Sequence, residues 1–488
     1  MFGDGEHYEL VVTNPSAQFS MLTSGEVDVV SQGVAVTLGQ DVAQSTTKRG
    51  FSFTYPFYFS GLAFGGVPEY VDCADRLDSF HGRCRGLRVC VTIGTTHEGI
   101  IRELMPGSIA VRYSEPMETL QHLIQGTCNV VAAEAGILDP THLNRLGLTL
   151  NFTVGDNIFS RDPLGLVTRD GETEWSDIVN SVIKVLYTAE AMNLTKENIE
   201  SYEFEDGINE DLKNRMVRVV STVGNYGELY GAEVDDTFAR DRQGINSLYS
   251  NAEGTGTGLL YSYPFGQEID EYPPEFESSF LDQIQARGYL RCGITEKPGF
   301  ATFNATTIEY SGIDVEFCRG LSAALFTGDA SRVEFSIWEE ADSFRALADD
   351  KVDVMAGQQV SLTNEFFEPT TNTSYFFSTP YFYGVNGTSR ALATRRVEEL
   401  WSSFVFWMVM AVVYAEEQGI SSSNAVEMPT VTSFGTTYIQ SFRDCIAAIG
   451  NYGDIYDRTL ASTLPRTGGN MLNTNPSFGP QQVAFPLV

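Results

Sequence analysis

The sequence predicts an α/β fold in which one unit occurs twice, first with two lobes and then with a single lobe. Strand-like and helix-like apolar patterns alternate along the chain, which is typical of sheets covered by helices. The segment at 223–230 reads VGNYGELY and recurs at 449–456 as IGNYGDIY, with only conservative exchanges. Self-similarity of this kind indicates an internal repeat.

The spacing between matching segments changes once along the chain. Up to Tyr383 they lie 324 or 325 residues apart, and from Trp401 onward they lie 226 apart. The first copy therefore contains an inserted unit of about a hundred residues that the second copy lacks. The matching pairs are 25–30 with 350–355, 55–59 with 379–383, and Trp175-Ser176 with Trp401-Ser402.

The first copy begins with a strand–helix–strand pattern. Residues 8–12 form a strand-like run, and 17–24 have a short helical pattern that ends at Gly25, in the position of a C-cap. Residues 27–30 follow as a buried strand. The aromatic run at 51–59 is predicted to be a strand that leaves this first sheet.

The inserted unit is predicted to be a compact α/β lobe over 67–162. After it the chain returns to the first sheet through a strand at 164–167, and two helical stretches follow at 175–192 and 208–230. Within the lobe we expect strands at 87–91, 110–113 and 128–133, and helices at 97–105 and 117–125.

The second copy follows an acidic linker at 267–278 that contains Pro273-Pro274. It shows an outgoing strand at 381–385 and a returning strand at 391–394, joined by a short turn where the first copy has its second lobe. The predicted opening elements are helix 280–287, strand 289–293 and helix 313–326. The predicted domains are 1–66 with 163–266 (lobe one), 67–162 (lobe two), 267–278 (linker) and 279–488 (second copy).

Residues 404–410 form a helix that is apolar on every side, whereas the matching helix at 175–192 carries Asp177, Asn180 and Lys184. A helix that is apolar all round is buried all round. We therefore expect this helix to pack against the first copy or against another chain. Two separate units would leave Phe404 and Trp407 in solvent.

Composition excludes several classes of function. A net charge of −33 repels a phosphate backbone and argues against nucleic acid as a partner. The seven cysteines contain no CxxC pair and the five histidines are scattered, so we predict no metal site. Cysteines in this number fit disulfides in an oxidising compartment. No hydrolase, metalloprotease, phosphate-loop or dinucleotide motif is present, so we predict neither an enzyme nor a cofactor.

Targeting and membrane signals are weak. Residues 1–6 have neither the basic start nor the apolar run of a secretion signal. The longest apolar run, 404–414, is shorter than the ~20 residues that cross a bilayer. We therefore expect no transmembrane segment in this chain.

The chain resembles the family-3 solute-binding proteins of bacterial ABC transporters, and the general L-amino-acid-binding type among them. The resemblance is carried by RGYLRCGI at 287–294, PGF at 298–300, GIDVEFCR at 312–319, CVTIGTT at 90–96 and GTC at 126–128. Residues 17–61 and both GNYG segments are also similar to the family. The resemblance implies the type II periplasmic-binding-protein fold, in which two α/β lobes joined by crossover strands enclose a ligand. It also implies an extracytoplasmic location.

The family's two disulfides correspond to Cys90–Cys128 and Cys292–Cys318. We add Cys73–Cys84 as a short loop closure. Neither copy is a complete receptor. The first begins without the strand that 289–293 supplies in the second, and the second has no second lobe. Either 289–326 inserts into the first copy's sheet, or each sheet stays incomplete and the apolar helix covers the gap.

Candidate ligand-binding residues follow from the same resemblance. The family's arginine, which binds the ligand carboxylate, is replaced by Gln40 in the first copy and is missing around Asn364 in the second. A charge-assisted pair of this kind is worth ~1.5–3 kcal/mol. We therefore predict that no common L-amino acid binds tightly.

Four further candidates each have a structural alternative. Gly94-Thr95-Thr96 offers either backbone N–H groups to an anion or a plain turn with a threonine cap. Glu134 stands near the family's ammonium-binding carboxylate, or it is a solvated surface residue. Phe300 stacks on a ligand or belongs to the core.

Two functions therefore remain open. The first is an extracytoplasmic solute-binding protein derived from amino-acid receptors, with a changed, amino-acid-like small ligand. The second is a non-binding derivative kept for structural or interaction roles, with a protein partner or self-association through the helix at 404–410. A catalytic function, like that of dehydratases built on this fold, ranks third.

Overall fold

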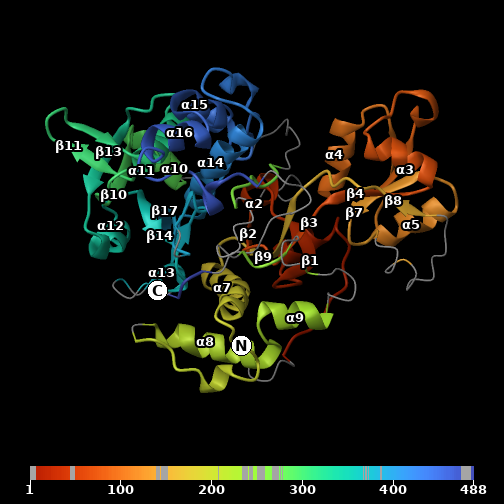
Figure 1. Ribbon diagram of the computed structural model, residues 1–488, viewed down its shortest axis with the longest axis horizontal. Coiled ribbons are helices and arrows are strands. Elements are labelled where there is room, and N and C mark those ends of the chain that lie inside the picture. The colour runs from red at the N-terminus through yellow and green to blue at the C-terminus, as the bar shows by residue number, and fades with distance from the viewer. Residues whose placement is uncertain are drawn as a thin grey trace.

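The computed structural model contains three sheet-based bodies and one small hairpin (Figure 1). We call the sheet of β1, β2, β3 and β9 with its helices lobe one, and the sheet of β4 to β8 lobe two. These two lobes are the first unit, and residues 279–487 are the second unit. The residues described are 7–43, 50–138, 143, 152–206, 208–233, 240, 246–249, 259–265, 274, 276, 279–366, 368, 371, 373–384, 387–473 and 485–487.

Lobe one lies between lobe two and the second unit (Figure 1). Its sheet has the order β1-β9-β2, and β3 also pairs with β9, all antiparallel. The strands are β1 (Val30–Ala35), β2 (Phe51–Phe53), β3 (Tyr58–Ser60) and β9 (Asp162–Arg169). The helices are α1 (Gln18–Ser24), α2 (Leu38–Val42), α7 (Thr173–Ala191), α8 (Glu210–Val223) and α9 (Tyr226–Glu233).

Lobe two is a mixed five-stranded sheet of order β6-β5-β7-β4-β8. Its strands are β4 (Leu62–Gly66), β5 (Arg88–Thr92), β6 (Ile109–Tyr113), β7 (Val130–Glu134) and β8 (Thr153–Val154). Its helices are α3 (Pro68–Asp75), α4 (Thr96–Leu104) and α5 (Pro116–Ile124). The predicted lobe is therefore present, and β4 continues directly from β3 of lobe one.

The second unit has a six-stranded sheet of order β13-β10-β14-β17-β15, with β16 also on β17. Its strands are β10 (Leu290–Ile294), β13 (Val333–Ile337), β14 (Val354–Gln359), β15 (Tyr375–Phe377), β16 (Phe382–Tyr383) and β17 (Ser389–Arg395), with β11 (Thr302–Asn304) and β12 (Glu309–Ser311) as a hairpin. Its helices are α10 (Phe280–Arg287), α11 (Ile313–Leu325), α12 (Ser343–Ala348), α13 (Leu362–Phe366), α14 (Glu399–Glu417), α15 (Ser441–Ile449) and α16 (Tyr452–Thr459).

The predicted α/β class is confirmed, and most predicted elements form within a few residues of their expected bounds. Gly25 ends α1 in the left-handed conformation at φ 75°, as its C-cap position predicts. The strand predicted at 8–12 does not form. These residues have no regular secondary structure, and Tyr8, Leu10 and Val12 are exposed. The linker predicted at 267–278 lies almost entirely outside the described residues.

Several hydrogen bonds recur between the units at the offset of 226. A hydroxyl pair joins Thr168 to Ser176 and Thr394 to Ser402, both at 2.7 Å. Each GNYG segment uses its asparagine and its tyrosine in the same way. The asparagine amide donates to the carbonyl of Leu194 or Ile420, and the tyrosine hydroxyl donates to the carbonyl of Phe57 or Tyr381.

The two units pack against each other through buried contacts. The ammonium of Lys184 on α7 lies 2.5 Å from the Glu365 carboxylate on α13. In the opposite direction, Trp407 Nε1 on α14 donates to Asp41 Oδ2 on α2 at 2.8 Å. Phe404 and Trp407 are fully buried, as expected for this apolar helix. Insertion of 289–326 into the first sheet does not occur, because β10 pairs with β13 and β14 of its own unit.

Three disulfides are present, and they join the expected cysteines. The bonds are Cys73–Cys84, Cys90–Cys128 and Cys292–Cys318. Cys445 is a buried thiol, and burial raises its pKa to about 12. The thiol is therefore protonated at neutral pH and is a weak nucleophile.

Candidate functional site

The candidate site lies where the chain crosses from lobe one to lobe two. Strand register places the groups there. Ser60 at the end of β3 pairs with Asp162 at the start of β9, and two residues later Leu62 of β4 pairs with Glu134 at the end of β7. The connection between the lobes therefore carries a carboxylate on each side, one from each sheet.

Three titratable side chains meet at this junction. His97, the second residue of α4, places Nε2 3.6 Å from Asp162 Oδ2. The hydroxyl of Ser160 donates to the same Oδ2 at 2.6 Å, and the hydroxyl of Ser60 donates to Glu134 Oε2 at 3.2 Å. His97 and Asp162 are buried. Asp162 Oδ1 has no hydrogen-bond partner among the described residues.

Burial raises the pKa of Glu134, the charge of His97 opposes this, and the nearby Asp162 adds to it. Two carboxylates beside one imidazole give the junction an excess of negative charge when both are ionised. A buried carboxylate oxygen without a partner is costly. A cation with hydrogen-bond donors, such as an ammonium or guanidinium group, would satisfy that oxygen and lower the repulsion.

The turn Gly94-Thr95-Thr96 leads directly into His97. Thr95 is the N-cap of α4, yet its side chain makes no capping bond, because its hydroxyl donates to the carbonyl of Thr92 at 2.8 Å. Gly94 has φ 80°, and a Cβ there would lie 3.8 Å from the carbonyl oxygen of Pro15 in lobe one. The turn therefore faces lobe one across the junction, which fits a position beside a solute.

Gln40 lies in the first turn of α2, close to the same junction along the chain. Val36, just before the Thr37 N-cap of this helix, donates to the carbonyl of Pro163, the neighbour of Asp162. Gln40 Oε1 is buried and has no partner among the described residues. An amide at this position cannot supply the charge that a ligand carboxylate requires.

Phe300 belongs to the second unit and is not brought together with the other candidates. Its ring is buried against Phe382 at a centroid distance of 4.9 Å. The cationic groups of Lys297 and Arg390 each lie 5.3 Å from its centroid. This packing is the core alternative for Phe300.

His97, Asp162 and Ser60 were not among the sequence candidates. His97 directly follows the Gly94–Thr96 turn, so a helix starting at residue 96 would have drawn attention to it. Asp162 directly precedes the returning strand predicted at 164–167. The pairing of Ser60 with Asp162 depends on strand register, which local sequence does not encode.

Curated relatives match about half of this chain. The general L-amino acid-binding periplasmic protein AapJ of Rhizobium johnstonii is 26% identical over 292 residues, which cover 54% of this chain and 79% of the relative. The glutamate/glutamine/aspartate/asparagine-binding protein BztA of Rhodobacter capsulatus is 26% identical over 287 residues, covering 54% and 80%. The relatives are periplasmic amino-acid-binding proteins. No family model matches the chain.

Solved structures of related type were also found. A periplasmic binding protein from Brucella ovis with glutathione bound has a TM-score of 0.43 at 24% identity, over 51% of this chain and 81% of that one. An ancestral amino-acid-binding protein, described as a precursor of cyclohexadienyl dehydratase, has a TM-score of 0.31 at 22% identity, over 40% and 77%. The sheets and helices of the chain are those of the type II periplasmic-binding-protein class.

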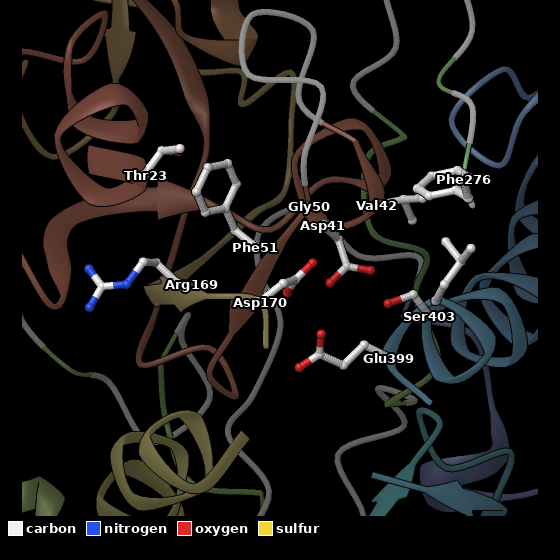
Figure 2. Close-up of a pocket in the computed structure, with 11 residues that line it drawn as sticks. Thr23, Asp41, Val42, Gly50, Phe51, Arg169, Asp170, Phe276, Glu399 and Ser403 are labelled. Atoms are coloured by element: carbon white, nitrogen blue, oxygen red, sulfur yellow. The ribbon is translucent and has the colours of Figure 1, made fainter. Parts of the chain in front are cut away.

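A separate cavity of about 320 Å³ lies at the boundary between the two units (Figure 2). Figure 2 shows the carboxylates of Asp41, Asp170 and Glu399 converging on it, whereas the guanidinium of Arg169 points away. Each carboxylate has a donor. Trp407 donates to Asp41, Ser52 donates to Asp170, and the backbone N–H of Gly171 donates to Glu399.

Burial is the main cause of raised pKa values in this acidic cavity. It raises the pKa of Asp41 to about 6, against the hydrogen bonds from Trp407 and Ser403 and the charge of Arg396. It also raises the pKa of Asp170 well above the ordinary value and, less strongly, that of Glu399. Protonation of these groups therefore favours the folded protein.

We expect Asp41 to make the stability of the protein depend on pH. Its folded pKa of about 6 lies above the ordinary 3.8, so its contribution is full below about pH 4 and is lost as the pH rises through 6. Between pH 5 and pH 8 the loss is about 1–2 kcal/mol. Urea unfolding at both pH values should show this slope in the wild type and a smaller one in Asp41→Asn, whose amide oxygen still accepts from Trp407.

Asp206 is exposed, so Asp206→Asn serves as the matched control and should keep the wild-type slope. Equal pH slopes for the wild type and Asp41→Asn would show that Asp41 titrates normally.

Within the described residues, no group of three or more histidine, cysteine, aspartate or glutamate side chains is arranged to hold a metal ion. In the same part of the chain, one helix, α14, is long and apolar enough to cross a membrane, and 67% of its most apolar window is buried inside the protein.

Proposed function

We propose that the protein is an extracytoplasmic solute-binding protein whose ligand is an organic cation held at the junction of the two lobes. The observation that carries the proposal is the buried Asp162 with an unpartnered Oδ1, beside His97 and close to Glu134. The relatedness to periplasmic amino-acid-binding proteins supports the general class of function.

The ligand class follows from what the junction offers and what it lacks. An α-amino acid needs a cation for its carboxylate and a carboxylate for its ammonium group. Glu134 and Asp162 supply the second requirement twice over. Gln40 stands where the resemblance expects the arginine for the first. We therefore propose an amine or guanidine that carries no essential α-carboxylate.

We further propose that the second unit is a degenerate tandem copy that holds lobe one in place. The bonds that recur at the offset of 226 support a common origin. The contacts between the units are also reciprocal: α7 of the first unit meets α13, and α14 of the second meets α2. Such exchange is typical of a two-fold interface between equal partners.

A non-binding derivative of the same fold is the second candidate. The single-lobed second unit favours it, because that unit has no second wall to enclose a ligand. The position of Glu365 favours it too. This residue follows the position of the missing arginine and bonds to Lys184 instead of facing a cleft.

A thermal-shift screen separates these candidates. We expect no rise in melting temperature with the standard L-amino acids, because no guanidinium meets their carboxylate. A saturating amine ligand at a hundred times its Kd should add about 2.7 kcal/mol of stability. The panel contains the standard amino acids and small mono-, di- and guanidino-amines.

Glu134→Gln is the test variant, and Glu200→Gln, at an exposed position, is its control. The shift should disappear in the first and remain in the second. A clear shift with a standard L-amino acid would make the ligand assignment wrong. The absence of any shift across the panel would favour the non-binding derivative.

A further inference from the structure

Strand β1 has a free side. It bonds to β9 on one side only, so it forms one edge of the lobe-one sheet. Its counterpart in the second unit is β14. The residue pair Val34–Gly165 corresponds to Gln358–Ala391, and Ala35–Leu164 corresponds to Gln359–Arg390. The two strands thus have the same register toward their shared neighbour.

The second unit shows what occupies the other side of β14. Strand β10 lies there in parallel, with Cys292 opposite Val354 and Gly293 opposite Met355. On its far side β10 pairs with the whole of β13, from Val333 to Ile337. One strand thus fills the space between β14 and β13.

Both neighbours of this missing strand exist in lobe one. At the offset of 324, Val354 and Met355 correspond to Val30 and Ser31 of β1. At the offset of 325, β13 corresponds to residues 8–12. Among the described residues, neither the free side of β1 nor residues 8–12 pairs with another strand. The side chains of Leu10 and Val12 are 79% and 96% exposed.

A second, independent difference lies on the helices. In the second unit, α11 follows β10 and packs on α15, so closely that a methyl group at Gly320 would lie 2.4 Å from Ile449 Cδ1. At the offset of 226, α8 of the first unit corresponds to α15, and Val223 corresponds to Ile449. Ile449 is 3% exposed, whereas Val223 is 42% exposed. The first unit lacks a helix at that place.

We propose that the free side of β1, residues 8–12 and the Val223 end of α8 form one docking surface for a strand–helix segment of the β10–α11 type. The occupant is a polypeptide with a short apolar strand that enters parallel to β1, followed by a helix with a small residue facing Val223. Strand addition to a free sheet edge is a general mode of peptide recognition, in which backbone hydrogen bonds supply the affinity.

A synthetic peptide with the sequence of residues 279–328, its two cysteines oxidised to the disulfide that links Cys292 and Cys318 in the chain, is the probe. It is added to the full chain, and binding is followed by fluorescence anisotropy and hydrogen exchange. We expect saturable binding, with amide exchange at 8–12 and 30–35 slowed by about tenfold or more. A peptide carrying Gly293→Pro is the control, since proline removes a strand N–H and disfavours pairing. It should not bind.

A second experiment does not depend on the free peptide folding. Residues 279–332 are duplicated and fused directly before His7, where the offset of 325 places the missing segment. This chain should show the same protection at 8–12 and 30–35, and a matched fusion with Gly293→Pro in the added copy should not. The double variant Leu10→Lys/Val12→Lys should weaken peptide binding, because it places charges on the exposed strand-like run.

Three outcomes would overturn the proposal. One is the absence of extra protection in both the peptide and the fusion experiments. Another is protection confined to β14 and β13, which would mean that the peptide exchanges with the chain's own β10. The third is full protection of 30–35 without any peptide in a dimeric sample, which would mean that the edge is covered by a second copy of the chain.

Discussion

Replacing Lys184 by methionine is expected to lower the free energy of unfolding at pH 7 by about 3–5 kcal/mol. The ammonium lies 2.5 Å from Glu365, and both side chains are only 8% exposed. It also lies over the ring of Phe485, 4.4 Å from the centroid. Without it, a buried carboxylate keeps one weak donor, Asn180 at 3.4 Å. Urea unfolding followed by circular dichroism measures the loss.

Two controls make this prediction specific to the buried pair. Lys213→Met removes the lysine of an ion pair with Glu210, whose side chain is 77% exposed, and should cost less than about 1 kcal/mol. The double variant Lys184→Met/Glu365→Leu should recover most of the loss, because no charge is left buried. A double variant no more stable than the single one would contradict this account.

Replacing Trp407 by alanine is expected to cost about 3–5 kcal/mol, because the side chain is completely buried. Its ring packs against Tyr263 and Phe265 of the segment that leads toward the second unit. Its Nε1 is also the donor to the buried carboxylate of Asp41. Both losses weaken the contact between the two units, and thermal unfolding should detect them as a lower melting temperature.

Trp407→Phe keeps most of the apolar volume and removes the donor, so it should cost about 1–3 kcal/mol. Trp175→Ala at the start of α7 is the matched control, because that ring is partly exposed and donates to the carbonyl of Asp28. If Trp407→Ala cost no more than Trp175→Ala, α14 would not be a central element of the fold.

Local patterns predicted the elements well because they depend on near neighbours. The αL glycine after α1 and the apolar periodicity of α14 are set within a few residues of sequence. The apolar character of α14 also predicted its burial, since a helix without a polar face has no other stable position in water. The three disulfides joined the expected cysteines.

Pairings over long distances were not predictable in the same way. Residues 8–12 have the composition of a strand, yet a strand forms only where a neighbour supplies backbone partners, and none is present among the described residues. Lys184 appeared in the sequence only as a polar residue on a helix. Its partner Glu365 lies far along the chain and in the other unit.

The candidate site shows the same division. Glu134 and the Gly94–Thr96 turn were identified from the resemblance. His97 and Asp162 join them through the start of α4 and the register of β3 on β9, which depend on the assembled sheets. Charge complementarity at the junction therefore emerges only in three dimensions.

The central claim is that the junction binds an organic cation and has lost the requirement for an α-carboxylate. Isothermal titration calorimetry with matched pairs tests it directly: agmatine against L-arginine, and cadaverine against L-lysine, which differ only in that carboxylate. We predict tighter binding of the amine in at least one pair, with loss of at least about tenfold in affinity, or ~1.4 kcal/mol, in Glu134→Gln. Tighter binding of the amino acid, unchanged affinity in Glu134→Gln, or no binding by either member of both pairs would contradict the claim.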